Sequence, residues 1–154
     1  MFHVILFEPE IPPNAGNVIR LCANTGSTLH LVRPLGFTLD DARVKRAGLD
    51  YHEMARVHEH ANLAACLGSF ERSRVFAVET TGGQRFDEPR YREGDAFLFG
   101  RETTGLPAEV VADWPAERLI RLPMIPGNRS LNLSNAAAIV LFEAWRQAGF
   151  VGGE

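Results

Sequence analysis

The stretch LPMIPGNRSLNLSNAAAIVLFEAWR, residues 122–146, joins an apolar strand to a long C-terminal helix. The strand is predicted at residues 117–122, and the helix from apolar residues that recur at steps of three and four between Leu133 and Trp145. The junction between them holds two prolines, a glycine, two serines and three asparagines. Polar turns at the carboxyl ends of strands are where open α/β sheets bind ligands. This stretch therefore predicts an α/β fold with a ligand site beside the turn.

Six strands are predicted in all, each a short apolar run bounded by turn residues or by a helical pattern. They are expected at residues 2–7, 28–32, 55–58, 74–79, 96–99 and 117–122. Residues 80–94, TTGGQRFDEPRYREG, contain paired glycines, a proline and scattered charges, so this segment is predicted to be a surface loop.

The predicted helices lie between these strands. Asn14 is a suitable N-cap for a helix at residues 15–25, which Gly26 ends. Three shorter helices are expected to begin after Asp40 or Asp41, after Asn62 and near Pro107. Strands that alternate with helices form a mostly parallel sheet with helices on both faces. The prediction is a single α/β domain, residues 1–154, with a mostly parallel six-stranded sheet.

Composition excludes several classes of protein. Hydrophobic residues make up 45% of the chain and charged residues 23%, which is typical of a globular domain. No apolar run approaches the roughly 20 residues that span a bilayer, and the N-terminus lacks the features of a signal peptide, so a cytoplasmic protein is expected. Cys22 and Cys66 have no CxxC spacing and are expected to be buried free thiols. The net charge of -3 argues against coating of nucleic acid by a general positive field, but leaves room for a local basic patch.

Common nucleotide and metal motifs are absent from the sequence. It contains neither the dinucleotide fingerprint GxGxxG nor the phosphate-binding GxxxxGK[ST]. His58 and His60 would lie on one side of a strand, where a metal site is one interpretation and a solvated sheet edge is the favoured one. We therefore predict no metal.

Three polar turns follow or precede hydrophobic strands: NAGNVIR at residues 14–20, FGRETTGLP at residues 99–107, and the closing turn. Together with EPEIPPNAGNVIRLCANTG, KRAGLDYH and RSLNLSNAAAIVLFEAWRQ, they resemble the motifs of the SPOUT superfamily of RNA methyltransferases. The resemblance covers essentially the whole chain and is narrower to the branch that consists of the methyltransferase domain alone.

This resemblance implies a fold, a reaction and partners. It implies a deep trefoil knot formed by the C-terminal segment, and a homodimer with the site at the subunit interface. It also implies S-adenosylmethionine as cofactor and methylation of the ribose 2'-hydroxyl of the wobble nucleotide, cytidine or uridine at position 34, in tRNA, with leucine isoacceptors as expected substrates. The alternatives are a catalytically silent RNA-binding or assembly protein of the same fold and a SPOUT methyltransferase that acts on rRNA.

By resemblance, the cofactor-binding positions are Val78, Gly100, Leu122 and Ser130, with Met124, Leu131 and Asn135 as neighbours. A mostly apolar cleft with a few fixed backbone donors and acceptors suits such a ligand. Purely structural roles are also open: turn geometry for Gly100, and capping of the last helix for Ser130 and Asn135.

The family assigns activation of the hydroxyl to an arginine that corresponds to Arg20. A guanidinium has a pKa above about 12 and is a poor base, so we expect Arg20 to stabilise the developing alkoxide or to bind a phosphate. Asn14 is expected to orient Arg20 or the RNA, or to cap its helix. Glu102 in the second turn is expected to hold Arg20 or a partner subunit's helix.

RNA-binding residues are predicted in two places. Arg43, Lys45 and Arg46 form a basic cluster near Tyr51, a combination that grips phosphates while a ring stacks on a base, although a solvated face is the commoner explanation. Arg101 occupies a position where the family commonly has proline, and an arginine there suits an RNA phosphate. The expected partner is the anticodon stem-loop of tRNA.

Overall fold

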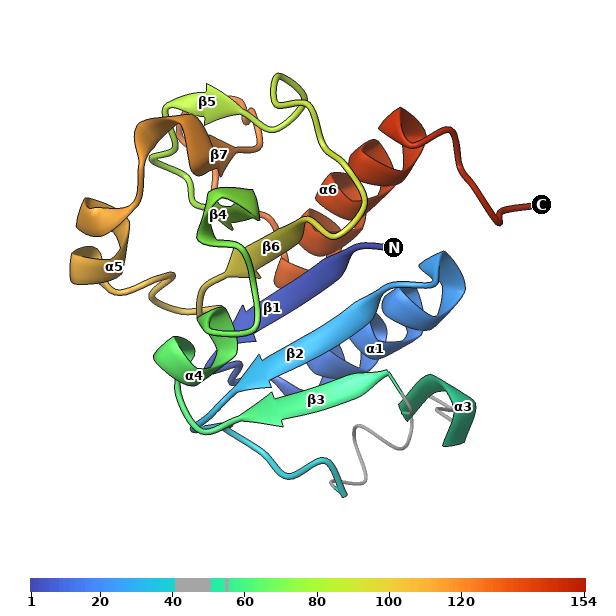
Figure 1. Cartoon of the computed structure of the whole chain (residues 1–154). Helices are drawn as coiled ribbons and strands as arrows, with labels where there is room; N and C mark the ends of the chain where they lie inside the picture. Colours follow the sequence, from blue (N-terminus) through green and yellow to red (C-terminus); the bar gives the residue numbers. More distant parts are fainter. Residues whose placement is uncertain (41–50, 55) are drawn as a thin grey trace.

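The computed structural model describes residues 1–40, 51–54 and 56–154 (Figure 1). The predicted helix with Arg43, Lys45 and Arg46 lies outside the described residues.

A parallel sheet forms the centre of the molecule, with the strand order β3-β2-β1-β6-β4-β7-β5. Every neighbouring pair in it is parallel. The strands are β1 (His3–Phe7), β2 (Thr28–Val32), β3 (Val57–His60), β4 (Val75–Val78), β5 (Gln84–Arg85), β6 (Ala96–Phe99) and β7 (Leu119–Arg121). The prediction of a mostly parallel α/β sheet is confirmed.

Two details of the strand prediction were wrong. The described chain has seven strands and not six, because Gln84 and Arg85 pair with β7 inside the predicted loop. Gly82 allows this pairing, since a Cβ at that position would lie 2.5 Å from the Ile120 carbonyl carbon. Two strands begin two residues later than predicted: the third at Val57 and the last at Leu119.

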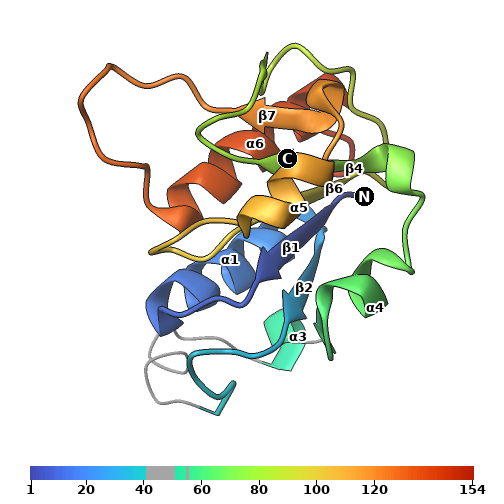
Figure 2. The same cartoon turned by 90° about the vertical axis from the view of Figure 1, so that its left-hand side faces the viewer.

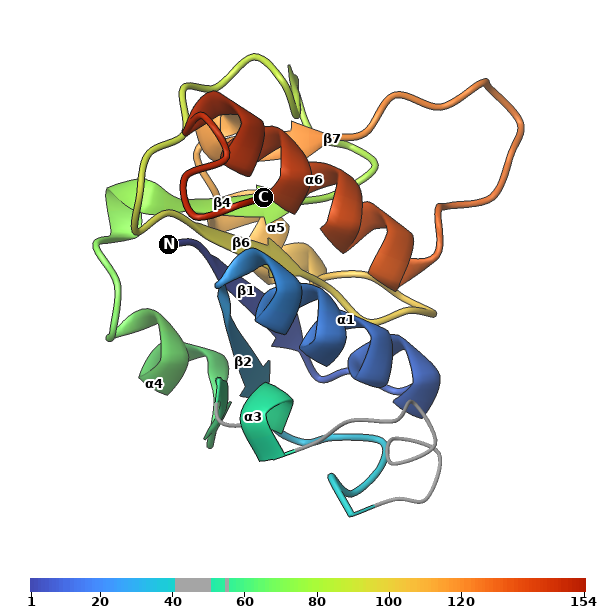
Figure 3. The ribbon, with the colours of Figure 1, turned by 90° about the vertical axis from the view of Figure 1, so that its right-hand side faces the viewer.

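The helices lie on both sides of the sheet. They are α1 (Pro12–Thr25), α3 (Tyr51–Met54), α4 (Leu63–Leu67), α5 (Ala108–Asp113) and α6 (Leu133–Gln147), with short 3-10 turns η1 (Arg72–Arg74) and η2 (Ala116–Arg118). In Figure 1, α1 and α6 lie on one side of the strands, and α4 and α5 lie on the other. Figure 3 shows α1 and α6 side by side, and Figure 2 shows the face with α5. Helices therefore cover both faces, as predicted.

Alternate residues of the strands divide the core into two layers. In β1, Val4 and Leu6 pack with α1 and α6, whereas Ile5 and Phe7 pack with the layer under α4 and α5. All four side chains are buried. This alternation follows from the period of two in a strand, and it explains why β1 is apolar on both faces.

The start of α1 differs from the prediction. The helix begins at Pro12, and its N-cap is Ile11, whose side chain makes no capping bond. Prolines fit the first turn of a helix because their missing N–H would have no partner within the helix. Asn14 therefore lies inside the first turn, and its prediction as N-cap was wrong.

In the described residues, no helix is long and apolar enough to cross a membrane. The trefoil knot and the single-domain boundary at residues 1–154 stay predictions.

Asp95 anchors the amino end of the sheet. It is fully buried and accepts hydrogen bonds from Nε and Nη2 of Arg74, at 2.7 and 2.5 Å, and from the Arg92 amide at 2.8 Å. The Arg74 side chain is only 23% exposed. Loss of the carboxylate would leave a poorly solvated guanidinium without its partner.

We expect Asp95→Ala to lower the free energy of unfolding by about 2–3 kcal/mol, because hydrogen bonds to charged groups contribute about 1.5–3 kcal/mol. Urea unfolding followed by circular dichroism measures the change. Asp87→Ala is the matched control, since it removes an exposed partner of Arg85 and should leave the midpoint unchanged. Equal midpoints for wild type and Asp95→Ala would contradict the assigned role.

Candidate active site

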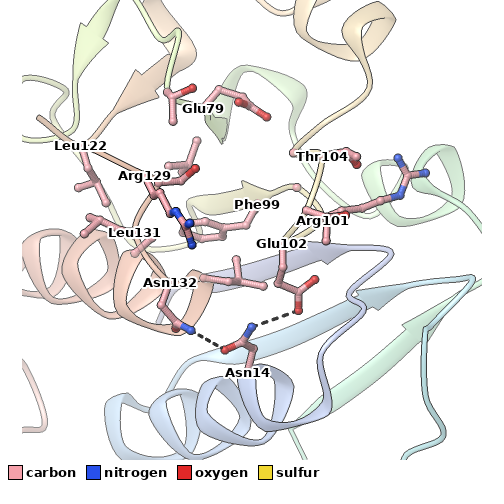
Figure 4. Close-up of a pocket in the computed structure, with 18 of the residues that line it drawn as sticks. Asn14, Glu79, Phe99, Arg101, Glu102, Thr104, Leu122, Arg129, Leu131 and Asn132 are labelled. Atoms are coloured by element: carbon pink, nitrogen blue, oxygen red, sulfur yellow. Dashed lines mark hydrogen bonds between the residues drawn. The ribbon is translucent and has the colours of Figure 1, made fainter. Parts of the chain in front are cut away.

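A pocket of about 630 Å³ opens at the carboxyl ends of β4, β6 and β7 (Figure 4). Residues that follow each of these strands line it, including parts of the second and third polar turns, and the start of α1, which carries the first polar turn, closes one side. Because the strands are parallel, their carboxyl ends meet at the same edge of the sheet. The lining consists of Ile11, Asn14, Val78–Thr80, Phe99–Gly105, Leu122, Met124, Arg129–Leu133 and Ala136.

Six of the seven predicted cofactor residues line this pocket: Val78, Gly100, Leu122, Met124, Ser130 and Leu131. Asn135 is not part of the lining. It lies in the first turn of α6, where its backbone N–H donates to Oδ1 of Asn132 at 3.4 Å.

Gly100 is required by the path of its own turn. A Cβ there would lie 2.2 Å from the backbone of Gly105 and Leu106, where no side chain fits. The backbones of Arg101 and Gly105 exchange two hydrogen bonds, at 2.9 and 3.2 Å, which close the turn. The interpretation of Gly100 as a turn residue is thus supported, and its backbone also faces the pocket.

Glu102 joins the second turn to the start of α1. Its carboxylate accepts hydrogen bonds from the amides of Glu10, at 2.8 Å, and Ile11, at 3.0 Å. These donors lie at the N-terminus of a helix, where backbone N–H groups lack partners and negative charge is favoured. Among the described residues, Glu102 makes no hydrogen bond to Arg20. Its hydrogen bonds go to the start of α1.

Asn14 connects the same carboxylate to the third turn. Its Nδ2 donates to Oε1 of Glu102 at 3.3 Å, and its Oδ1 accepts from Nδ2 of Asn132 at 2.9 Å (Figure 4). Asn14 is only 5% exposed. One side chain thus ties together the three polar turns that the sequence singles out, a role different from capping α1 or orienting Arg20.

Asn132 is the residue that caps α6. Its Oδ1 accepts from the backbone N–H of Ser134 at 2.9 Å and of Asn135 at 3.4 Å. The capping role considered for Ser130 and Asn135 therefore belongs to Asn132, since an N-cap residue must directly precede the helix. Its amide nitrogen remains available for Asn14.

Arg20 lies on α1 but does not line the pocket. Its Nε donates to Oε1 of Glu53 in α3 at 3.1 Å, and its side chain is 45% exposed. The structure therefore does not bring the predicted catalytic arginine to the predicted cofactor residues of the same chain.

Arg101 does line the pocket, where its guanidinium forms an ion pair with Glu8 and lies 4.9 Å from the centre of the Phe7 ring. The pair and the ring hold the side chain beside β1. A phosphate would have to share Arg101 with Glu8.

Sequence reasoning missed six polar lining residues: Glu79, Thr80, Thr103, Thr104, Arg129 and Asn132. Glu79 directly follows β4, and its Oε1 accepts from the Leu106 amide at 2.6 Å. Its position at the carboxyl end of a predicted strand was the signal that could have identified it. The hydrogen bond to Leu106 joins the turn after β4 to the turn after β6.

Comparison with known proteins gives the family. Residues 1–142 match the SpoU rRNA Methylase family. The chain is 60% identical over 155 residues to the tRNA (cytidine(34)-2'-O)-methyltransferase of Burkholderia ambifaria, with 99% of each chain covered. It is 51% identical over 152 residues to the protein of the same name from Escherichia coli K12, with 99% of this chain and 97% of that relative covered.

Solved structures with a similar fold are also RNA methyltransferases. A structure described as "Structural insights into the 2-OH methylation of C/U34 on tRNA" is 46% identical, with a TM-score of 0.89 and 97% of both chains covered. An AdoMet-bound rRNA methyltransferase from Sinorhizobium meliloti is 27% identical, with a TM-score of 0.79 over 94% of this chain and 56% of that one. The chain therefore belongs to the SpoU rRNA Methylase family of SPOUT methyltransferases, as the resemblance of its polar turns predicted.

Proposed function

We propose that this chain transfers a methyl group from S-adenosylmethionine to the ribose 2'-hydroxyl of the wobble nucleotide, cytidine or uridine at position 34, in tRNA. The observation that carries the proposal is full-length similarity to relatives with that named activity. The relatives named as tRNA methyltransferases match this chain over 97–99% of their own length. The rRNA methyltransferase described above is matched over only 56% of its length, so tRNA is the better-supported substrate. We also infer that the reaction takes place in the cytoplasm.

The pocket suits the cofactor in size and chemistry. A volume of about 630 Å³ falls within the range of about 300–1,000 Å³ that is usual for small-molecule sites. Val78, Leu122 and Leu131 supply apolar walls, while the turns after β4 and β6 supply backbone donors and acceptors. We assign cofactor binding to Val78, Gly100, Leu122, Met124, Ser130 and Leu131, with Asn135 as a supporting neighbour in α6.

When bound, S-adenosylmethionine supplies an electrophilic sulfonium methyl group. The chain must hold the ribose oxygen in line with that group, and such positioning lowers the barrier because it removes the entropic cost of the encounter. The oxygen also loses a proton as it attacks. We assign to Arg20 the stabilisation of the developing alkoxide or the binding of the adjacent phosphate, since an arginine does not act as a base at neutral pH.

A homodimer with the site at the interface is part of the proposal. Ile139 and Phe142 of α6 are 40% and 45% exposed, and Ile11 and Leu131 at the pocket are each 41% exposed. Exposed apolar side chains that cluster on one side mark surfaces that associate with a partner. Burial of the α6 side chains by a second copy would place that copy beside the pocket and extend the surface offered to an anticodon stem-loop. Arg101, with Arg43, Lys45 and Arg46, is the proposed set of phosphate contacts.

Calorimetric titration with S-adenosylmethionine tests the pocket. We expect one cofactor per chain for the wild type and no binding for Ser130→Trp, because the indole would occupy part of the pocket that Ser130 lines. Ser69→Trp introduces the same side chain at an exposed position outside the pocket lining and should bind normally. A folded wild type that takes up no cofactor at millimolar concentration would support the catalytically silent alternative.

Methylation of tRNA transcripts, with leucine isoacceptors first, tests the role of Arg20. We expect Arg20→Ala to lower the rate by about 100-fold or more, the usual cost of one lost electrostatic contact to a developing oxyanion, with unchanged cofactor affinity. Arg92→Ala is the control, since Arg92 is also an exposed, ion-paired arginine but lies next to Asp95 at the amino end of the sheet, opposite the pocket. Methylation of rRNA but not of tRNA would overturn the assigned substrate.

Sedimentation measures the proposed homodimer. We expect Phe142→Glu to produce monomers at concentrations where the wild type is a dimer, because a carboxylate would be buried without a partner. Val151→Glu introduces the same charge at a residue that is 79% exposed in the C-terminal tail and should leave the dimer intact. A monomeric wild type would contradict the proposal.

A further inference from the structure

Potential metal ligands meet on the face of the sheet beneath α4, away from the pocket, and four of them form the candidate site. His3 lies on β1, His30 on β2 and His60 on β3, while Cys66 lies on α4. None of them lines the candidate active site. The three histidines come from adjacent parallel strands, so the sheet itself brings them together.

The rings form a chain across the three strands. Nδ1 of His3 lies 3.0 Å from Nε2 of His30, and Nδ1 of His30 lies 2.9 Å from Nε2 of His60. One ligand atom from each of His30, His60 and Cys66 lies within 4.8 Å of the other two. His30 is 7% exposed and Cys66 is fully buried.

We propose that His30, His60 and Cys66 bind one Zn²⁺ ion, with His3 as a positioning residue that fixes the ring of His30. Two imidazole nitrogens and one thiolate are ligands that Zn²⁺ prefers, and three protein ligands leave a fourth tetrahedral position for water. The sequence alone favours a solvated strand edge for the histidines of β3. A metal site explains this cluster better than a solvated edge does, because α4 places Cys66 beside His30 and His60.

The role of His3 follows from the hydrogen-bond chain. If Nδ1 of His30 binds the ion, its Nε2 carries the proton and donates to Nδ1 of His3. Metal-binding histidines generally donate their second ring nitrogen in this way, which fixes the tautomer and the ring orientation. Phe70 adds an apolar wall, since its ring contacts those of His3 and His30 edge-on, each with centroids 5.1 Å apart.

Binding of the ion would require the three ligand atoms to move. A nitrogen and a sulfur on one tetrahedral ion lie about 3.6 Å apart, so Sγ of Cys66, within 4.8 Å of the two nitrogens, would approach by at most about 1.2 Å. Two nitrogens that lie about 2.0–2.1 Å from a tetrahedral ion are about 3.3–3.4 Å apart. His30 and His60 must therefore separate by about half an ångström from their 2.9 Å contact. Zn²⁺ binds the thiolate form of cysteine, so ion binding would displace the Cys66 proton to the solvent.

A bound ion would have a structural consequence. β3 is an edge strand, and α4 has only five residues. Through Cys66, His60 and His30, the ion would connect α4 to the edge strand β3 and to its neighbour β2. The ion would therefore stabilise this side of the sheet, with water in its fourth position, independently of methyl transfer.

Titration of the full chain with Co²⁺ and then Zn²⁺ tests the site without an activity assay. We expect one Co²⁺ per chain with a thiolate-to-metal absorption band, displacement of that band by Zn²⁺, and a higher melting temperature with Zn²⁺. Cys66→Ser should abolish the band and weaken Zn²⁺ binding by at least ~100-fold, as loss of a direct ligand must cost more than loss of a supporting contact. His3→Phe should keep the band and weaken binding by about 10–100-fold.

Cys22→Ser is the matched control, because Cys22 is the other buried free cysteine and packs on the opposite face of the sheet. It should bind Zn²⁺ like the wild type. The wild type alone suffices to overturn the proposal: if it shows no thiolate band with Co²⁺ and no Zn²⁺ binding, the site does not exist. A band that survives in a folded Cys66→Ser variant would also overturn it.

Discussion

The carboxylate of Glu102 is the contact on which the arrangement of the site depends. It binds two amides at the start of α1 and the side chain of Asn14, which in turn binds the N-cap of α6. The two helices that cover one face of the sheet therefore begin at the same small network. Loss of this carboxylate would leave two N–H groups at the start of α1 and Nδ2 of the buried Asn14 without their partner, and the second polar turn would lose these bonds to α1.

Much of the fold could be predicted from sequence because the strands of a buried parallel sheet are short apolar runs, and the helices that cover it repeat apolar residues every three or four positions. The strand at residues 96–99 and the helix from Leu133 are defined by local pattern, and both were correct. β5 could not be predicted, since its two residues are polar and become a strand only through contact with β7. The start of α1 was misjudged for a similar reason: the group that satisfies its amides comes from Glu102, far away in the sequence.

The location of the site was predictable, but the partners within it were less so. Val78 and Leu122 belong to strands whose carboxyl ends must meet, and both line the pocket. Which asparagine caps α6, and which side chain bridges the turns, depends on distances between segments that no local pattern contains. The cluster of His30, His60 and Cys66 is a further case, because the cysteine joins the histidines only through the packing of α4.

The position of Arg20 outside the pocket is compatible with a role in the reaction when the energies are compared. Its ion pair with Glu53 joins a side chain that is 45% exposed to one that is 17% exposed. Exposed pairs contribute about 0–1 kcal/mol, and the shielded carboxylate places this pair toward the upper end of that range. A phosphate offers a guanidinium a bidentate, charge-assisted contact, which is stronger than a single exposed pair. If Arg20 binds a phosphate of the RNA, as proposed above, that contact replaces the ion pair with Glu53.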